Sequence, residues 1–451
     1  MISVSGIRGH VGTDLTPELV ARYAAALGAW SRLAKSDRPT VILGRDARTS
    51  GSMYARAASA GLMSVGVDVI DLGIVPTPTV QLAVEHHHAG AGLILTASHN
   101  PIEWNALKFV GPDGIFLDAE AGHAVRTLAE QGPTRSSWSE LGTVLDDPDA
   151  VERHLSAILD LPLIDVPRIR SRRFRVALDC VRGAGSSAML PLLDKLGCQV
   201  HGINLEMDGR FPRAPEPVPE NLGELGNLVR EYGADVGLAV DPDVDRLALV
   251  DESGRPIGED YTLAFAVRAV LDGRRSGGVP PTVVVNLSTS LVVEDAARNG
   301  GARFIRAPVG EANVARTIRE EGALIGGEGN GGVMLPALHI GRDAPLGVAL
   351  ILHLLATTGV TVSELVQASP RYTIVKAKAA RGSDLRVLYD RLRSRFSDAV
   401  VDERDGLRLA WTDRWLHIRP SGTEPILRLI AEAPTEADAR ALVAAGREYL
   451  D

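Results

Sequence analysis

Two polar segments contain the residues whose types and spacing best suit chemistry on a phosphate. In the first, residues 96–101, Ser98 and His99 follow the apolar run 92–95. The segment is therefore expected at the carboxyl end of a buried strand, where α/β sheets bind ligands. A serine hydroxyl close to a cation such as Lys108 could carry a phosphoryl group. An ordinary turn is the alternative, because Ser, Asn and Pro are common turn residues.

The second segment holds three aspartates within five positions. Asp241, Asp243 and Asp245 lie between the apolar runs 236–240 and 247–250, which predicts a loop joining two strands. Carboxylates this close repel one another unless they share a cation or remain in water. Their hard oxygen ligands favour Mg²⁺, with Ca²⁺ and Mn²⁺ as other candidates and a solvated acidic turn as the alternative.

Two further loops are informative only in combination with the first two. The glycine-rich segment 326–332 contains Glu328 and Asn330 and could approach a polyhydroxylated ligand. The segment 419–424 follows an expected strand and combines a guanidinium, two hydroxyls and a glycine, which suits a phosphate. Taken alone, either could be a turn.

Together the four loops resemble the signature loops of the α-D-phosphohexomutase family, in order and spacing, over essentially the whole chain. The resemblance implies an enzyme that interconverts hexose 6-phosphate and hexose 1-phosphate. The phosphoryl group would pass from a phosphoserine to the sugar, and the hexose 1,6-bisphosphate intermediate would then reorient. Its other phosphate would return to the serine.

The resemblance also implies a role for each matching residue. Ser98 would be the phosphoserine, and Mg²⁺ would bind Ser98, Asp241, Asp243 and Asp245. Catalytic roles would further fall to Arg8, His99, Lys108 and Arg246. Glu328 and Asn330 would grip sugar hydroxyls. The non-reacting phosphate would be held by Arg419, Ser421, Gly422 and Thr423.

One position departs from the bacterial pattern of this family. Where those members have a histidine proposed as general acid or base, this chain has Gly332. The Glu-x-Asn-Gly-Gly form resembles the archaeal-type phosphoglucosamine and phosphoglucose mutases. It predicts glucosamine phosphate as the best substrate, glucose phosphate second and mannose phosphate third. Lys108 is then the expected acid–base group, with His339 as the alternative.

Other activities compete with this interpretation. A haloacid-dehalogenase-like phosphatase would use Asp241 and Asp243, but Asp245 stands where it wants Thr or Val. An EF-hand is disfavoured because Arg246 occupies the position of the turn glycine. The chain has no Gly-Lys pair, which argues against a P-loop kinase. A non-catalytic sugar- or Ca²⁺-binding protein would have no use for a phosphorylatable serine.

The elements that must position these loops follow a repeated order. Three segments beginning near residues 41, 174 and 282 each run strand, loop, helix, glycine, strand, and then the pattern changes to antiparallel-style strands. The predicted fold is α/β, with three similar mixed-sheet βαβ domains and a smaller C-terminal α+β domain around a central cleft. The expected domains, which carry the phosphoserine, metal, sugar and phosphate loops in that order, are 1–150, 151–252, 253–366 and 367–451.

Composition narrows the partners. The chain has 451 residues, 45% of them hydrophobic and 23% charged, so a folded protein of several domains is expected. A net charge of −9 disfavours nucleic acid, and two cysteines exclude a disulfide framework. No apolar run is long enough for a membrane span, and no secretory signal is recognisable. We expect a cytoplasmic monomer or homodimer acting on a small phosphosugar.

Overall fold

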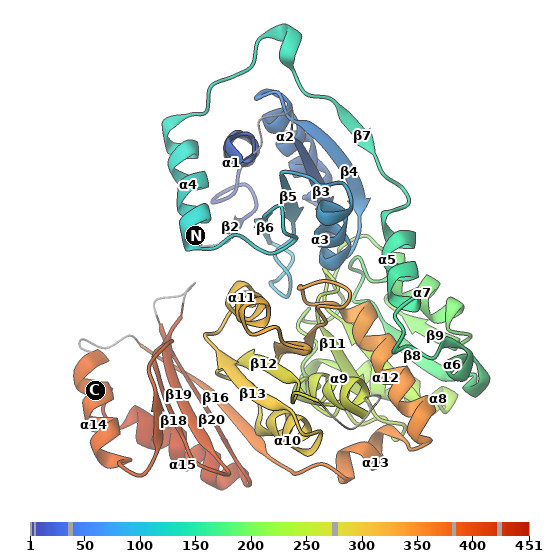
Figure 1. Cartoon of the computed structure of the whole chain (residues 1–451), viewed down its shortest axis with the longest axis vertical. Helices are drawn as coiled ribbons and strands as arrows, with labels where there is room; N and C mark the ends of the chain where they lie inside the picture. The colour runs from blue at the N-terminus through green and yellow to red at the C-terminus, as the bar shows by residue number, and fades with distance from the viewer. Residues whose placement is uncertain are drawn as a thin grey trace.

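The computed structural model describes residues 2–3, 6–34, 39–272, 278–380, 385–421 and 426–450. It confirms the predicted fold class, with three α/β domains in succession and a smaller α+β domain at the C-terminal end (Figure 1). The first domain lies at the top of the view in Figure 1. The fourth domain lies at the lower left, beside the third.

The first domain is built on a seven-stranded sheet of order β1-β2-β6-β5-β3-β4-β7. Its strands are β1 Ile2–Ser3, β2 Gly6–His10, β3 Thr40–Arg45, β4 Asp68–Ile74, β5 Ala91–Leu95, β6 Trp104–Val110 and β7 Val144–Asp146. Its helices are α1 Pro17–Ala34, α2 Gly51–Met63, α3 Thr77–His86 and α4 Ala119–Gln131, with the short η1 at Trp138–Glu140. Because side chains alternate along β3, Val41 and Leu43 pack with α1, α2 and α4, whereas Ile42 packs with α3.

The second and third domains have four-stranded sheets of order β9-β8-β10-β11 and β13-β12-β14-β15. The second contains α5 Ala150–Leu159, α6 Val166–Arg172, β8 Arg175–Asp179, α7 Ser186–Lys195, β9 Gln199–Ile203, η2 Pro219–Asn221, α8 Gly223–Tyr232, β10 Val236–Val240 and β11 Leu247–Val250. The third contains α9 Asp260–Asp272, β12 Thr282–Asn286, α10 Leu291–Asn299, β13 Arg303–Ala307, α11 Glu311–Glu321, β14 Ile325–Glu328, β15 Gly332–Met334, α12 Ala344–Thr358 and α13 Val362–Gln367. The apolar helix α12 contributes to one hydrophobic core shared by both domains.

The three α/β domains repeat one topology. In each, a central strand is flanked by two parallel strands, and the third strand pairs with an antiparallel fourth. The turn from the third to the fourth strand holds Ser98 in the first domain, the three aspartates in the second, and Asn330 in the third. Three of the four predicted loops therefore occupy equivalent positions.

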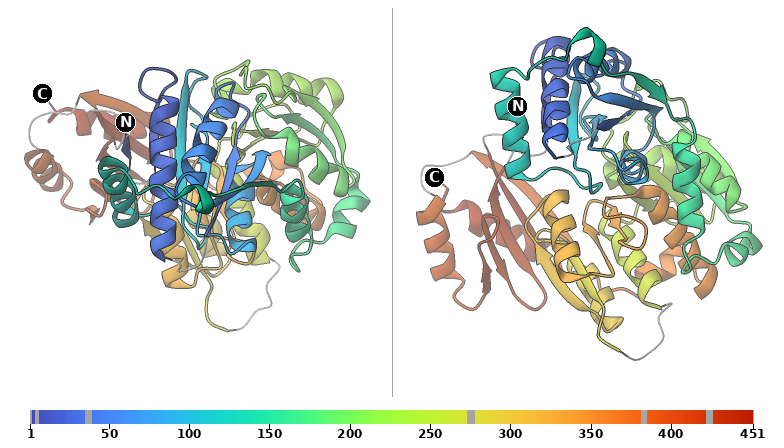
Figure 2. Two further views of the ribbon diagram at one scale, coloured as in Figure 1. Left: turned by 90° about the horizontal axis from the view of Figure 1, so that it is seen from above. Right: turned by 45° about the horizontal axis from the view of Figure 1, so that its top comes forward.

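The fourth domain is an antiparallel sheet of order β16-β20-β19-β18-β17, as its short turns predict. Its elements are β16 Thr373–Ala380, α14 Leu385–Arg395, β17 Val400–Asp402, β18 Leu407–Ala410, β19 Trp415–Pro420, β20 Ile426–Ala433 and α15 Glu436–Arg447. Figure 2 shows this sheet beside the third domain. Buried Glu432 joins the two, accepting hydrogen bonds from Leu291 N at 2.8 Å and from Ser290 Oγ of the third domain, and from Trp415 Nε1 of its own at 2.6 Å.

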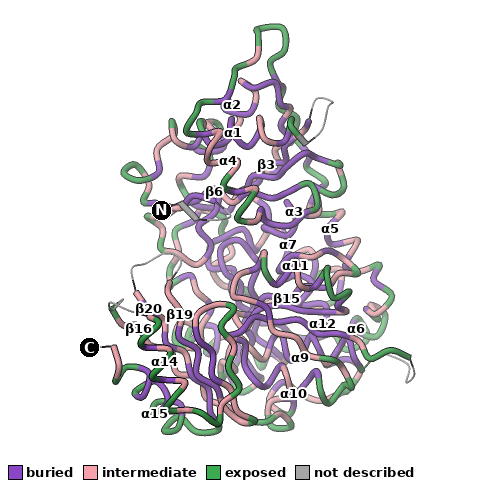
Figure 3. Tube along the Cα trace, turned by 60° about the vertical axis from the view of Figure 1, so that its left-hand side comes forward, coloured by how far each residue is buried: buried purple, intermediate pink, exposed green. Residues whose placement is uncertain are grey.

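Burial follows the sheets and the helices between them (Figure 3). Within the described residues, no helix combines the length and the apolar character needed to cross a membrane.

The contact between the third and fourth domains contains a buried histidine that should make the stability of the protein depend on pH. Buried His417 lies 2.8 Å from Ser288 Oγ through Nδ1 and 2.7 Å from Asp405 O through Nε2, and burial lowers its pKa to about 4. The unfolded chain, with a histidine pKa of about 6.5, binds this proton first, so stability falls as the solution is acidified below that value. We expect His417 to account for about 2 kcal/mol of the unfolding free energy lost between pH 7 and pH 5. Urea unfolding of wild type and His417→Gln at both pH values measures it, and equal losses in the two proteins would contradict the assignment.

Candidate active site

The three aspartates form a buried cluster in the loop between β10 and β11. Asp241, Asp243 and Asp245 are at most 1% exposed, and one carboxylate oxygen from each lies within 4.8 Å of the others. The loop is therefore not a solvated acidic turn, and the cluster needs positive charge close by.

Ser98 reaches this cluster from the first domain. The side chain is 3% exposed, and its Oγ donates a hydrogen bond to Asp241 Oδ2 at 2.8 Å. Ser98 also has a φ of +49°, a conformation that a residue with a side chain rarely adopts. Strain of this kind is typical of functional positions, and here it accompanies contact between the serine and the acid cluster.

Arg48, which the sequence analysis missed, holds the Ser98 loop in place. Its guanidinium donates to the carbonyl oxygens of Ser98 and Asn100, each at 2.6 Å, and its Nε donates to Asp46 Oδ2 at 3.0 Å. It also donates to the carbonyls of Pro101 and Trp104. Arg48 shares with Ser98 its position soon after a buried strand, but a single arginine gives no indication in sequence of these partners.

Lys108 is the cation of Asp243. Its Nζ lies 2.7 Å from Asp243 Oδ2 and 3.9 Å from Asp245 Oδ2, and Thr77 Oγ1 donates to the same Asp243 oxygen at 2.8 Å. Burial opposes the ammonium charge, but the two carboxylates outweigh it and raise the pKa of Lys108. A lysine that stays charged can neutralise the aspartates. It cannot accept a proton, so the raised pKa gives no support to the expectation that Lys108 is the acid–base group.

Three further predicted residues lie around Ser98 and the cluster. Arg246 Nε is 3.7 Å from Asp245 Oδ1 and 3.9 Å from Asp241 Oδ2, and Arg8 donates to Asn100 Oδ1 at 2.6 Å. Burial, with Arg246 and Arg8 nearby, lowers the pKa of His99 well below its ordinary value. His99 is therefore neutral at pH 7.

The charges of the whole cluster favour a divalent cation. Buried Glu311 and Glu328 join the three aspartates, and Lys108, Arg246 and Arg342 form ion pairs with these acids. Arg8 also interacts electrostatically with Asp243, and Arg246 is shared with Glu216, so acids outnumber cations at this site. Burial and repulsion from Asp245 and Asp243 raise the pKa of Asp241 well above its ordinary value, which is the cost of this excess.

The free oxygens of the cluster also fit a metal. Asp243 Oδ1 and Asp245 Oδ1 are buried and accept no hydrogen bond from any described group, whereas the second oxygen of each is held by Lys108 and Arg342. Two carboxylate oxygens without a hydrogen bond, beside Asp241 and Ser98 Oγ, form an all-oxygen donor set, which suits Mg²⁺.

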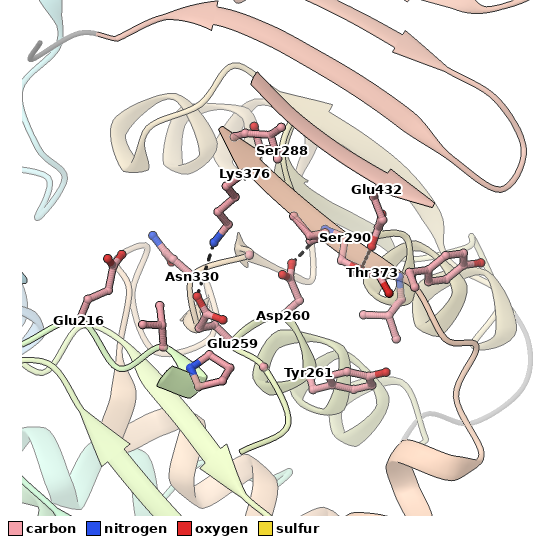
Figure 4. A pocket seen from close by; sticks show the side chains of 18 of the residues that line it. Glu216, Glu259, Asp260, Tyr261, Ser288, Ser290, Asn330, Thr373, Lys376 and Glu432 are labelled. Atoms are coloured by element: carbon pink, nitrogen blue, oxygen red, sulfur yellow. Dashed lines mark hydrogen bonds and ion pairs between the residues drawn. The ribbon is translucent and has the colours of Figure 1, made fainter. Parts of the chain in front are cut away.

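The loop predicted to bind the sugar, residues 326–332, has one of its two polar side chains buried and the other in a cavity. Glu328 is 4% exposed, and its carboxylate accepts from Asn286 Nδ2 at 2.8 Å, Gly310 N at 3.1 Å and Arg342 at 2.9 Å. Asn330, in contrast, lines a cavity of about 790 Å³ between the second, third and fourth domains (Figure 4). Glu216 lines the same cavity 3.3 Å from Arg246, so the cavity adjoins the acid cluster.

The predicted phosphate loop and the alternative acid–base residue His339 lie in different surroundings. Arg419 Nε lies 2.9 Å from Asp405 Oδ2, and Ser421 Oγ accepts from Arg428, a residue that lines the cavity. Gly422 and Thr423 lie outside the described residues.

His339 forms a hydrogen bond with Asp343 at 3.0 Å, and His154 forms one with the same carboxylate oxygen. These three buried side chains form a group of their own, separate from the aspartate cluster.

Comparison with known proteins agrees with this geometry. Residues 2–135, 152–254 and 258–372 match the phosphoglucomutase/phosphomannomutase alpha/beta/alpha domains I, II and III, and residues 374–448 match the C-terminal domain. The chain belongs to this family. It is an α-D-phosphohexomutase, an enzyme that transfers a phosphoryl group within a hexose phosphate.

Individual relatives of this phosphohexomutase cover almost its full length. A phosphoglucomutase/phosphomannomutase of Thermococcus kodakarensis is 38% identical over 99% of this chain and 97% of its own. A phosphoglucosamine/phosphogalactosamine mutase of Sulfurisphaera tokodaii is 33% identical over 98% of this chain and 97% of its own. A crystal structure of a Burkholderia thailandensis phosphoglucomutase/phosphomannomutase family protein shares the fold, with a TM-score of 0.86 at 24% identity over 100% of this chain and 98% of its own.

The aspartate cluster can be tested as a Mg²⁺ site by substitution. Asp243→Asn keeps the shape of the side chain but replaces a charged carboxylate ligand by a neutral amide, so Mg²⁺ affinity and activity should fall together, by at least about tenfold. Isothermal titration calorimetry with Mg²⁺ measures the affinity. Asp251→Asn is the matched control, because Asp251 is a buried carboxylate that pairs with Arg255. Unchanged Mg²⁺ affinity in Asp243→Asn would rule out this metal site.

Proposed function

We propose that this phosphohexomutase acts through a phosphoserine at Ser98 and a hexose 1,6-bisphosphate intermediate, with glucosamine phosphate as its preferred substrate. The observation that carries the proposal is the contact of Ser98 Oγ with Asp241, at 2.8 Å, inside a charge cluster that fits Mg²⁺. No other described serine hydroxyl contacts these aspartates.

The reaction is a symmetrical exchange of one phosphoryl group. A sugar hydroxyl attacks the phosphorus, the bond from phosphorus to Ser98 Oγ breaks, and a bond to the sugar oxygen forms. The net proton movement is from the sugar hydroxyl to Ser98 Oγ.

Charge neutralisation accounts for most of the catalysis expected at such a site. Mg²⁺ held by Ser98, Asp241, Asp243 and Asp245 would supply positive charge to the phosphoryl oxygens. Lys108 and Arg246 surround the same cluster, and Arg8 is fixed to the Ser98 loop through Asn100. These cations orient the phosphoryl group without bulk water having to reorganise.

The bisphosphate has to turn between the two half-reactions. We assign the non-reacting phosphate to the loop that begins at Arg419, on the fourth domain. Arg428 and Lys376 of the same domain line the cavity and add positive charge on that side. One phosphate site can then hold either end of the intermediate, so the two half-reactions can use one set of groups.

Replacing the nucleophile gives the decisive test. Ser98→Ala should fold normally and lose activity by a factor on the order of 10⁴ or more, as nucleophile deletions do. In wild type incubated with glucose 1,6-bisphosphate, mass spectrometry should find one added phosphoryl group on the peptide that contains Ser98. Near-normal turnover in Ser98→Ala would exclude the phosphoserine route.

The preference for an amino sugar is supported by the acids of the cavity. Glu259 faces the cavity beside Asn330, and its Oε1 lies 3.7 Å from Nζ of Lys376, a largely exposed lysine (Figure 4). Its neighbour Asp260 is buried, which raises the pKa of that carboxyl to about 8, so the acid of this pair that forms an ion pair with a lysine is Glu259. The ammonium of glucosamine phosphate could replace Lys376 on Glu259. The Sulfurisphaera relative, named for amino-sugar phosphates, agrees with this choice.

Substrate specificity should therefore depend on Glu259. We expect kcat/KM to decrease in the order glucosamine, glucose and mannose phosphate, and Glu259→Gln to reduce the glucosamine-to-glucose ratio roughly tenfold by removing a charge-assisted hydrogen bond. Coupled assays on the three 6-phosphates measure this. Glu220→Gln, at another acid of the cavity, is the control. A preference for mannose phosphate beyond about tenfold would overturn the ranking.

A further inference from the structure

Arg342 joins three segments that the reaction uses. Its NH2 lies 2.5 Å from Asp245 Oδ2, its NH1 lies 2.9 Å from Glu328 Oε2, and its Nε lies 3.1 Å from Glu311 Oε2. The residue is 7% exposed. One guanidinium therefore connects the metal loop, the sugar loop and the first turn of α11.

Gly332 makes this position of the arginine possible. A β-carbon at residue 332 would lie 2.2 Å from Cδ and 2.7 Å from Cγ of Arg342, far inside van der Waals contact. The φ of Gly332 is not positive, so the backbone itself would accept an alanine. The reason for glycine here is the volume taken by the Arg342 stem.

The contacts of Arg342 determine which oxygens remain available. Because Arg342 occupies Asp245 Oδ2, the oxygen left without a hydrogen bond from the described residues is Oδ1, and this is the atom that Asp245 could offer to a metal. Because Arg342 also occupies Glu328 Oε2, that carboxylate is fixed two residues before Asn330, at the edge of the cavity. A group that holds both side chains controls their geometry together.

We propose that Arg342 is a positioning residue of the mutase reaction, and that Gly332 is required because any side chain there would displace it. Arg342 orients Asp245 toward the metal and holds Glu328 toward the sugar loop. The inference rests on the proposed function for the sugar, but the metal part can be measured without turnover.

Charge alone is the competing explanation, and two variants separate it from position. Arg342→Lys keeps one positive charge but cannot reach three carboxylates at once. Gly332→Ala keeps the arginine itself and pushes it aside. Neither variant changes the net charge, so any loss of Mg²⁺ affinity reports the lost orientation of Asp245.

The experiment combines these variants in a double-mutant cycle. In calorimetric titrations with Mg²⁺ alone, Arg342→Lys and Gly332→Ala should each bind Mg²⁺ roughly 10- to 100-fold more weakly than wild type, the usual effect of removing a partner that orients a metal ligand. In an Arg342→Ala background, Gly332→Ala should add less than about twofold, because the space is then empty. KM for the phosphosugar should rise in both charge-conserving variants.

Controls test whether the losses come from the site. Arg168→Lys weakens contacts to the carbonyls of Ala356 and Thr357, and Gly223→Ala adds a methyl where nothing lies within 4 Å. Both should retain wild-type Mg²⁺ affinity, and thermal melting should show all variants folded.

Wild-type Mg²⁺ affinity in Arg342→Lys and Gly332→Ala would overturn the proposal, as would equal effects of Gly332→Ala in the two backgrounds. If wild type itself turned over no phosphosugar, the proposed function would fail while the Mg²⁺ titrations still decided the role of Arg342.

Discussion

The burial of five carboxylates beside a smaller number of cations is the constraint on which the arrangement of this protein depends. Ionised carboxylates are stable in an interior only when they are paired and hydrogen-bonded. Each cation here serves more than one acid, and the partners come from different domains: Lys108 of the first contacts Asp243 of the second, and Arg342 of the third contacts Asp245. The ion pairs that offset part of the charge of the site therefore also join the three α/β domains.

The repeated topology brings these groups to one place. In each α/β domain the functional loop is the turn from the third, parallel strand to the antiparallel fourth, so equivalent edges of the three sheets face one another. The helix α12 supports two of these edges through its apolar surface, which belongs to the core shared by the second and third domains. Hydrophobic packing sets the distances, and charge pairing sets the orientations.

The fourth domain relates to the others differently. Buried Glu432 accepts hydrogen bonds from Ser290 and Leu291 of the third domain and from Trp415 of its own, whereas the described ion pair between Lys376 and Glu259 across the same cavity is long and partly exposed. A buried carboxylate with three partners is costly to separate, but an exposed ion pair contributes little. The fourth domain is therefore attached to the third more firmly at Glu432 than at Lys376.

The sequence by itself was sufficient to predict the fold class and to identify those site residues that stand in a recognisable pattern with their neighbours in the chain. Ser98 and the three aspartates each follow a short apolar run, and the change from βαβ units to antiparallel strands is visible in the spacing of turns. The partners of these residues had no such signal. Arg48 contacts residues 50 or more positions away, and Arg342 lies 97 positions from Asp245. Only the tertiary structure decided these pairs, and with them the raised pKa of Lys108 and the closeness of the Arg342 stem to Gly332. The reason is that electrostatic energy and packing depend on distance in space and on burial, not on separation along the chain.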